Sequence, residues 1–362
     1  MGNSNLTKAK KEKNDEFYTQ FHDIEKEINS YLDYNPDVFR DKTVLLPCDD
    51  PEWSNFTLFF AQNFERFGMK KLISTSYSAN TQEGYHPTSF EVNDPQYDEK
   101  KTMENGKIFT LTHDISGDGK VDINDLVWEY LDGNGDFNSP EVKKLRDESD
   151  IVITNPPFSL FRNFLAWIME ANKQFVTLGS INAITYKEVF PLIKENKIWL
   201  GSTNGVKVYN KPDGTEEKMG NTCWFTNIDH GRRHQPLNLM TEVDVIKFVT
   251  KKPFVEYDNY DAIEVPYVKQ IPNGYDGVMG VPISFLDKYN PNQFEILGTS
   301  DNGLIDDKYK KTPGLTKEFV DNYYRNGGTG TYREGNPTAG RYENNVAKMV
   351  YKRIFIKHKQ NI

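Results

Sequence analysis

The chain has 362 residues, of which 37% are hydrophobic and 13% aromatic, so it carries enough apolar material to bury a core in one large or two ordinary domains. The formal net charge of −9 argues against a protein that coats nucleic acid indiscriminately, because such proteins carry a basic excess. Its two cysteines, Cys48 and Cys223, have no CxxC spacing, which argues against both a disulfide framework and a cysteine-rich zinc site.

The amino-terminal stretch has the composition of a tail. Residues 1–14 are polar and rich in lysine, so we expect a disordered basic tail without the apolar core of a secretory signal. Nowhere do about eighteen apolar residues run together, which argues against a membrane span. These features predict a soluble, cytoplasmic protein that does not associate with membranes, and we expect it to be a monomer.

From residue 15 onward, strand-like and helix-like patterns alternate. A helical pattern at 21–32 precedes a hydrophobic run at 43–46, which ends in the acidic turn Pro47-Cys-Asp-Asp50 before a helical stretch at 54–67. Further strands are predicted at the following ranges: 70–77, 151–153, 175–184, 197–201 and 222–228. Such alternation predicts an α/β fold with a mainly parallel, seven-stranded sheet.

A turn with unusual chemistry follows the strand at 151–153. Asn155-Pro-Pro-Phe158 cannot continue the strand, because proline supplies no N–H to the ladder. Apolar residues at helical spacing follow at 160–168, so the tetrapeptide lies on a strand-to-helix turn. In open α/β sheets this carboxyl edge is where ligands bind.

The groups on this turn suit a planar aromatic amine. The Asn155 amide oxygen and the Pro156 carbonyl oxygen are two acceptors that can converge on one amino group, and Phe158 offers a ring face. An amino group held in this way is a better nucleophile toward an activated methyl group. The alternative from the tripeptide alone is a proline-rich turn that merely ends a strand.

An aspartate-rich stretch at 114–125 has the spacing of a calcium loop. The candidate ligands are Asp114, Ser116, Asp118, Asp122 and Asp125. The stretch departs from that pattern because its last position is Asp and a strand-like segment, 107–112, precedes it. A β-hairpin turn rich in Asp and Gly has the same composition, so both readings stay open.

Beyond residue 234 the pattern changes to short β-like pieces broken by Pro, Gly and Asn, which predicts a smaller, irregular, β-rich region at 235–362. The glycine-rich run at 326–333 predicts a mobile loop. Basic residues in this region could form a local basic surface, and they are Lys308, Lys310, Lys311, Arg325, Arg333 and Arg341.

Three segments, 15–20, 132–158 and 221–228, together resemble the EcoRI-type adenine-specific DNA methyltransferase family, and the likeness covers most of residues 14–300. The resemblance implies a Rossmann-like methyltransferase fold with a catalytic domain at 15–234 and a DNA-recognition region at 235–362. It implies S-adenosylmethionine as the cofactor and double-stranded DNA as the partner. The implied reaction methylates the exocyclic N6 of a flipped adenine at specific sites, in restriction-modification or phage/host DNA protection.

The resemblance also implies site residues. The catalytic set is Asn155, Pro156, Pro157 and Phe158, and the cofactor-binding set is Phe17, Tyr18, Thr19, Pro47, Cys48, Asp49, Asp50, Asp136, Phe137 and Asn155. In this reading an acidic residue of the first turn binds the methionine ammonium, and Asp136 ends a third strand beside the cofactor adenine. No metal is needed, because the methyl group is already activated.

Two other functions stay open at this point. The Asn-Pro-Pro motif is compatible with methylation of amino nitrogens in general, so the substrate could be an RNA adenine or a protein glutamine amide. A calcium-dependent binding module on a methyltransferase-like fold is the other possibility. The DNA target sequence and the base-reading residues do not follow from the sequence.

Overall fold

The computed structural model describes residues 18–47, 49, 54–78, 94–205, 207–210 and 215–359. The chain forms two compact units, the first made of residues 1–181 and 200–231 and the second of residues 182–199 and 232–362. The segment 182–199 thus groups with the carboxyl-terminal part, and the domain boundary expected at residue 234 stays a prediction. None of the helices in the described ranges is both long and apolar enough to cross a membrane.

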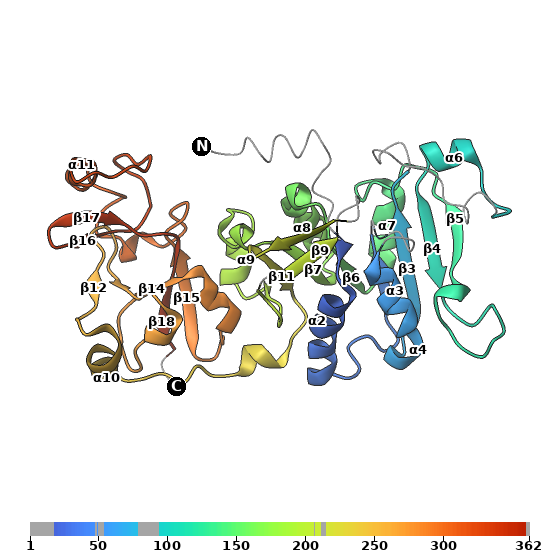
Figure 1. Ribbon diagram of the computed structural model, residues 1–362, viewed down its shortest axis with the longest axis horizontal. Coiled ribbons are helices and arrows are strands. Elements are labelled where there is room, and N and C mark those ends of the chain that lie inside the picture. Colours follow the sequence, from blue (N-terminus) through green and yellow to red (C-terminus); the bar gives the residue numbers. More distant parts are fainter. Residues whose placement is uncertain are drawn as a thin grey trace. The chain divides into compact units, whose positions relative to one another are not determined.

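The first unit is built on an eight-stranded sheet with the order β5-β4-β3-β2-β6-β7-β11-β8 (Figure 1). The strands are β2 (Thr43–Leu46), β3 (Lys71–Ser76), β4 (Lys107–Leu111), β5 (Val127–Tyr130), β6 (Ile151–Thr154), β7 (Gln174–Ser180), β8 (Trp199–Leu200) and β11 (Thr222–Thr226). A smaller antiparallel sheet joins β1 (Tyr18–Thr19), β9 (Lys207–Asn210) and β10 (Glu216–Met219).

The main sheet is mixed rather than mainly parallel. Its four central strands, β3, β2, β6 and β7, are parallel, whereas β4, β5 and β11 each run antiparallel to a neighbour. The α/β class is therefore confirmed, but the sheet has eight strands instead of seven. Between β3 and β4 the described part of the chain includes the six-residue α6 (Glu99–Glu104).

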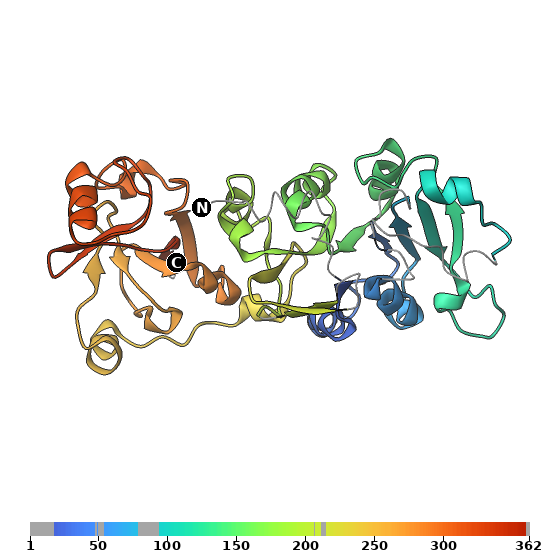
Figure 2. The ribbon, with the colours of Figure 1, turned by 45° about the horizontal axis from the view of Figure 1, so that its top comes forward.

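Helices cover both faces of the sheet. Those of the first unit are α2 (Phe21–Tyr34), α3 (Asn55–Gln62), α4 (Phe64–Phe67), α6, α7 (Pro140–Glu148) and α8 (Phe161–Glu170). In Figure 2 the blue helices α2 and α3 lie on one side of the sheet and the green helices α7 and α8 on the other. Every residue of β2 and β6 is buried, as expected for strands covered on both faces.

The second unit is centred on a five-stranded sheet with the order β12-β13-β14-β18-β15. Its strands are β12 (Val255–Glu256), β13 (Ile263–Glu264), β14 (Met279–Pro282), β15 (Phe294–Thr299) and β18 (Arg353–His358), with a separate pair β16 (Gly340–Glu343) and β17 (Val346–Met349). Its helices are α9 (Phe190–Lys194), α10 (Glu242–Asp244), a π-helical turn (Val245–Thr250) and α11 (Lys317–Arg325). A buried Arg353–Glu264 ion pair of 2.7 Å links β18 to β13.

Candidate active site

Two strand-to-helix turns lie next to each other at the carboxyl edge of the central strands. β2 and β6 pair in parallel, so both end at the same edge of the sheet. Beyond them, the Thr154 hydroxyl donates a hydrogen bond of 2.9 Å to the Pro47 carbonyl oxygen. This bond holds the turn that begins at Pro47 beside the turn that begins at Asn155, so the edge brings together two segments that lie about a hundred residues apart in the chain.

Asp49 is the buried carboxylate of the first turn, with 6% of its surface exposed. Ser54 Oγ donates to its Oδ1 at 2.7 Å, and its backbone carbonyl accepts hydrogen bonds from the Thr57 and Ser74 hydroxyls. The second carboxylate oxygen, Oδ2, is buried and has no hydrogen-bond partner among the described residues. Burial raises the pKa of Asp49 to about 7, because the ionised form loses its hydration, and the nearby Thr154 and Ser54 hydroxyls offset only part of this rise. The site therefore favours a cation placed at Oδ2.

Sequence reasoning missed the hydroxyls that surround Asp49. Thr57 lies on α3 and Ser74 on β3, and their hydroxyl oxygens are 3.0 Å apart. Neither belongs to a motif, because Ser and Thr are common in helices and strands. A weak signal existed only for Ser54, whose side chain caps α3 by accepting a hydrogen bond from Phe56 N, as serine often does before a helix.

Thr19, which the family resemblance implied as a cofactor contact, lies at the first turn of α3. β1 pairs with β9, and this places the Thr19 carbonyl oxygen 2.8 Å from Asn55 Nδ2. Asn55 follows Ser54, the residue that binds the Asp49 carboxylate. Thr19 is 3% exposed, and its hydroxyl oxygen is buried without a hydrogen-bond partner among the described residues. The structure thus brings Thr19 and Asp49 to the same helix terminus.

The Asn155–Phe158 turn is partly buried. Pro156 is buried, whereas Asn155 and Phe158 are half-buried, and Phe158 packs against the core cluster on the α2/α3 side of the sheet. A 3-10 turn (Phe158–Leu160), closed by a hydrogen bond from Leu160 N to Pro157 O, leads into α8. The predicted strand-turn-helix context of the motif is therefore confirmed.

Asp136 lies near the carboxyl end of β3, but no strand ends there. β5 ends at Tyr130, so the expectation that Asp136 ends a third strand is wrong. The preceding Gly135 has φ +83°, and a Cβ on it would lie 2.2 Å from the Ser76 backbone oxygen at the end of β3. The Asp136 carboxylate accepts a hydrogen bond of 2.8 Å from Asn138 N, just before α7. This places Asp136 at the same edge as Asp49.

Phe137 packs in the core rather than lying open at the edge. It is 3% exposed and makes edge-to-face contacts with Phe164 and Trp167 of α8, with ring centroids 5.3 and 5.7 Å away. Its ring is therefore occupied by helix packing. A contact between Phe137 and the cofactor adenine stays a prediction.

Part of the implied cofactor set cannot be placed. Phe17, Cys48 and Asp50 lie outside the described residues, and for Tyr18 only the backbone is described, as part of β1. The positions given above are those of the remaining described members, Thr19, Pro47, Asp49, Asp136, Phe137 and Asn155.

The aspartate-rich loop at 114–125 is held together by its own backbone. Asp125, which is 2% exposed, accepts hydrogen bonds from Ile115 N, Ser116 N and Asp122 N, and Asp114 accepts from Gly117 N and Gly119 N. Within the described ranges, no group of three or more His, Cys, Asp or Glu side chains is arranged to hold a metal ion. In this structure the carboxylates of Asp114 and Asp125 hold the turn between β4 and β5, and calcium binding by this loop stays a prediction.

Replacing Asp125 with asparagine is expected to lower the melting temperature, because three backbone N–H groups lose their carboxylate. The matched control is Asp118→Asn, since Asp118 is exposed and accepts one backbone bond. Backbone hydrogen bonds lower the pKa of Asp125 to about 2, so its contribution to stability is present above the unfolded value of about 4 and is lost as pH falls toward 2. Thermal melts at pH 7, 4 and about 2 should show the difference between wild type and variant shrink; a constant difference would contradict the role.

Many of the basic residues predicted to form a surface are neutralised by ion pairs. These pairs are Lys310–Asp307 at 2.8 Å, Lys311–Glu256 at 2.6 Å and Arg341–Glu343 at 3.9 Å. Arg325 and Arg333 are exposed, and neither takes part in an ion pair between described residues. The basic surface of the second unit is therefore smaller than the sequence suggests.

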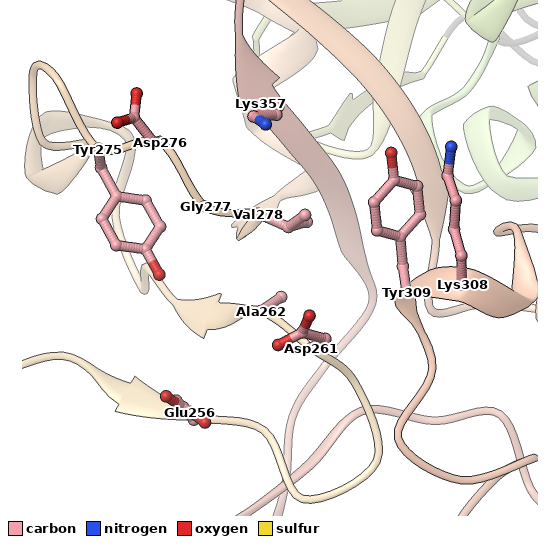
Figure 3. A pocket seen from close by; sticks show the side chains of 10 residues that line it. All are labelled: Glu256, Asp261, Ala262, Tyr275, Asp276, Gly277, Val278, Lys308, Tyr309 and Lys357. Atoms are coloured by element: carbon pink, nitrogen blue, oxygen red, sulfur yellow. The ribbon is translucent and has the colours of Figure 1, made fainter.

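The second unit also contains a cavity of about 390 Å³ (Figure 3). Side chains of both charges line it together with two tyrosines, including Asp261, Asp276, Lys308, Lys357, Tyr275 and Tyr309. Its lining comes from the second unit alone, whereas the strand ends that carry Asp49 and Asn155 belong to the first.

Comparison with known proteins agrees with this geometry. The chain matches the family described as "Adenine-specific methyltransferase EcoRI" over residues 5–359. It is 43% identical to the Type II methyltransferase M.EcoRI of Escherichia coli over 312 residues, covering 82% of this chain and 89% of that protein. It is 34% identical to M.MpnI of Mycoplasma pneumoniae over 376 residues, covering 99% of each, and 33% identical to M.MgeORF184P of Mycoplasma genitalium over 310 residues, covering 81% and 85%. No solved structure matches significantly.

The family match spans nearly the whole chain, including both units and both turns of the candidate site. The residues that prompted the resemblance therefore lie within a match that extends far beyond them. The chain belongs to the EcoRI family of adenine-specific methyltransferases.

Proposed function

We propose that this protein is a site-specific DNA adenine methyltransferase that transfers a methyl group from S-adenosylmethionine to N6 of a flipped adenine, in restriction-modification or phage/host DNA protection. The observation that carries the proposal is the Asn155–Phe158 turn at the carboxyl end of β6, held beside the buried Asp49 through Thr154. Family membership supports adenine in DNA as the substrate.

The residues of the edge fit the proposed cofactor. The buried Oδ2 of Asp49 suits the methionine ammonium, because a carboxylate oxygen that accepts no hydrogen bond from a described residue would gain a charge-assisted hydrogen bond in a dry site. Thr19 and the α3 terminus lie beside it, and Asp136 lies at the end of β3, where a ribose or adenine would be within reach. When bound, the cofactor supplies an activated methyl group.

The Asn155 turn would act on the target base. Asn155 Oδ1 and the Pro156 carbonyl oxygen would accept the two amino hydrogens of adenine and direct its lone pair outward, while Phe158 stacks on the ring. Flipping costs a few kcal/mol, which stacking and these hydrogen bonds must offset. Most of the rate enhancement would then come from positioning and from the electrostatics of the two acceptors.

We also propose a role for the second unit, an oligomeric state and a cellular location. The second unit would recognise the DNA duplex, since a site-specific enzyme needs side chains that reach base edges in a groove. The form we propose is a soluble, cytoplasmic monomer. Base reading by the second unit is compatible with the acidic total charge only if the contact surface is local and basic.

The test is transfer of labelled methyl from S-adenosylmethionine to unmethylated genomic DNA, followed by nucleoside digestion and mass analysis. We expect labelled N6-methyladenine, with label confined to one target sequence when the sites are mapped. Total RNA and protein serve as parallel substrates. Label in RNA or protein but not in DNA would overturn the proposed substrate, and absence of S-adenosylmethionine binding would overturn the proposed reaction.

A further inference from the structure

Two exposed arginines, which form no ion pair with any described residue, flank one loop of the second unit. Arg325 ends α11, and Arg333 follows the glycine-rich residues 326–332, here called the glycine loop. In Figure 1, α11 lies close to the β16–β17 pair, and the two elements share a small hydrophobic cluster. This cluster is separate from the core that contains Tyr257 and Phe355. The loop therefore has a packed base of its own.

Hydrogen bonds to tyrosine hydroxyl groups of α11 hold the glycine loop in place. Tyr323 Oη accepts a hydrogen bond of 3.0 Å from Gly330 N. Tyr324 Oη accepts one of 2.8 Å from Tyr332 N and lies 2.8 Å from the Gly330 carbonyl oxygen. The expectation of a mobile loop is therefore not supported, because both the middle and the end of the loop are held to α11.

Ring packing explains why the loop is rich in glycine. A Cβ on Gly328 would lie 2.2 Å from the Tyr323 ring, and a Cβ on Gly330 would lie 2.2 Å from the Tyr332 ring. Tyr323 and Tyr332 also meet edge to face, with centroids 5.5 Å apart. Side chains at these glycines would push the rings away. The loop is thus compact and hydrogen-bonded without a bound partner.

Several hydrogen-bonding side chains of this element are exposed. Thr329, Thr331 and the two arginines are exposed. The backbone of Arg333 is fixed by reciprocal hydrogen bonds, from Arg333 N to Asn336 Oδ1 at 2.8 Å and from Asn336 N to Arg333 O at 3.1 Å. A guanidinium on a fixed backbone suits bidentate contact with the O6 and N7 atoms of guanine in the major groove. Rigid placement lowers the entropy cost of such a contact.

We propose that the glycine loop enters a groove of duplex DNA, where Arg333 reads a guanine of the target sequence and Arg325 contacts a phosphate. The inference rests on the proposed DNA methyltransferase function and identifies a specificity-determining residue of that reaction. Arg325 is assigned to the backbone because it lies at the helix end, where its position follows α11 rather than the loop tip. The tyrosines are positioning residues, since they act through the loop.

The experiment compares the full-length wild type with Arg333→Ala, Arg325→Ala and Tyr324→Phe. Lys348→Ala is the matched control, because Lys348 is an exposed cation on the neighbouring β17. Each protein methylates unmethylated genomic DNA, and the methylated adenines are mapped by sequencing. Thermal melting and S-adenosylmethionine binding verify that each variant is folded.

Arg333→Ala is expected to leave one position of the mapped target degenerate, a position that is guanine on one strand in the wild type. Its kcat/KM on the wild-type target should fall about 10- to 100-fold, as expected for loss of one bidentate base contact. Arg325→Ala should weaken binding to all duplexes equally and reduce the salt slope of log Kd by about 1. Tyr324→Phe should lower DNA affinity without changing the KM for S-adenosylmethionine.

Two outcomes would overturn the inference in distinguishable ways. If the wild type methylates adenine in DNA but the Arg333→Ala target is identical to that of Lys348→Ala, the loop does not read bases and the proposed function stands. If the wild type methylates no DNA, the inference fails together with the proposed function.

Discussion

Replacing Asn155 with alanine is expected to lower the turnover of methyl transfer by about 100- to 1,000-fold, the usual cost of losing one preorganised hydrogen-bonding group at a reacting centre. The dissociation constant of S-adenosylmethionine should change little, because Asn155 would contact the target amino group chiefly through Oδ1. Single-turnover kinetics with labelled cofactor and equilibrium binding measure the two quantities separately. The half-buried position of Asn155 makes alanine structurally tolerable.

The conservative variant Asn155→Asp separates chemistry from folding. Aspartate keeps an oxygen acceptor at the same place, so we expect it to retain more turnover than alanine. Aspartate also brings a charge that alanine lacks, so thermal melting serves to verify that each variant is folded rather than to match their stabilities. Equal losses of turnover and of cofactor affinity in Asn155→Ala would contradict the assigned role, as would an Asp variant that is no more active than the Ala variant.

Replacing Asp49 with asparagine is expected to raise the dissociation constant of S-adenosylmethionine about 10- to 100-fold, because a hydrogen bond to a charged group in a dry site is lost. The wild-type affinity should also depend on pH. With the pKa of Asp49 near 7, the ligand-free protein is about half protonated at neutral pH, and a cationic ligand binds the ionised form. Affinity should therefore rise from pH 6 to pH 8, and the variant should lack this Asp49-dependent rise.

The same substitution is expected to stabilise the ligand-free protein at alkaline pH. The unfolded chain releases the Asp49 proton near pH 4 and the folded chain near pH 7, so the folded state binds more protons between these values. Stability therefore falls as pH rises through this window, by at most about 4 kcal/mol. The Asp49→Asn side chain carries no such charge, and thermal melts at pH 5 and pH 8 should show the variant gaining relative to wild type, with a clearly larger gain at pH 8.

The matched control for Asp49 is Asp136→Asn, because Asp136 lies at the same edge but is only partly buried and bonded to Asn138 N. No comparable gain in stability at pH 8 is expected for it. Weaker cofactor binding by both variants with no difference in their pH profiles would contradict a special role for the buried Asp49 carboxylate.

Much of the candidate site could be predicted from contiguous residues. The strand-turn-helix context of Asn155 follows from local rules, since proline ends a strand and apolar spacing begins a helix. The strand expected to end at Asp136 instead ends at Tyr130, so the position of Asp136 depends on the loop that follows β5. β4 and β5 form an antiparallel hairpin whose turn is held by Asp125, whereas the sequence allowed both a hairpin turn and a calcium loop at 114–125.

Long-range packing also decided the roles of individual side chains. The ring of Phe137 packs against Phe164 and Trp167 of α8, a contact that the sequence did not indicate. Lys310 and Lys311 look equivalent to Arg333 in the sequence, but nearby carboxylates neutralise the two lysines. Such pairing depends on how the chain folds around each lysine, so composition alone overestimates the basic surface.

The sequence by itself pointed to the reaction class, because Asn155, Pro156 and Phe158 are neighbours in the chain and belong to segments that together resemble one methyltransferase family. Only the tertiary structure decided that Asp49 is a buried carboxylate with a pKa near 7, since desolvation depends on everything that surrounds a group. It also decided that the glycine loop is fastened by Tyr323 and Tyr324. Chemistry carried by adjacent residues can be read locally, whereas burial, charge pairing and strand direction are properties of the folded chain.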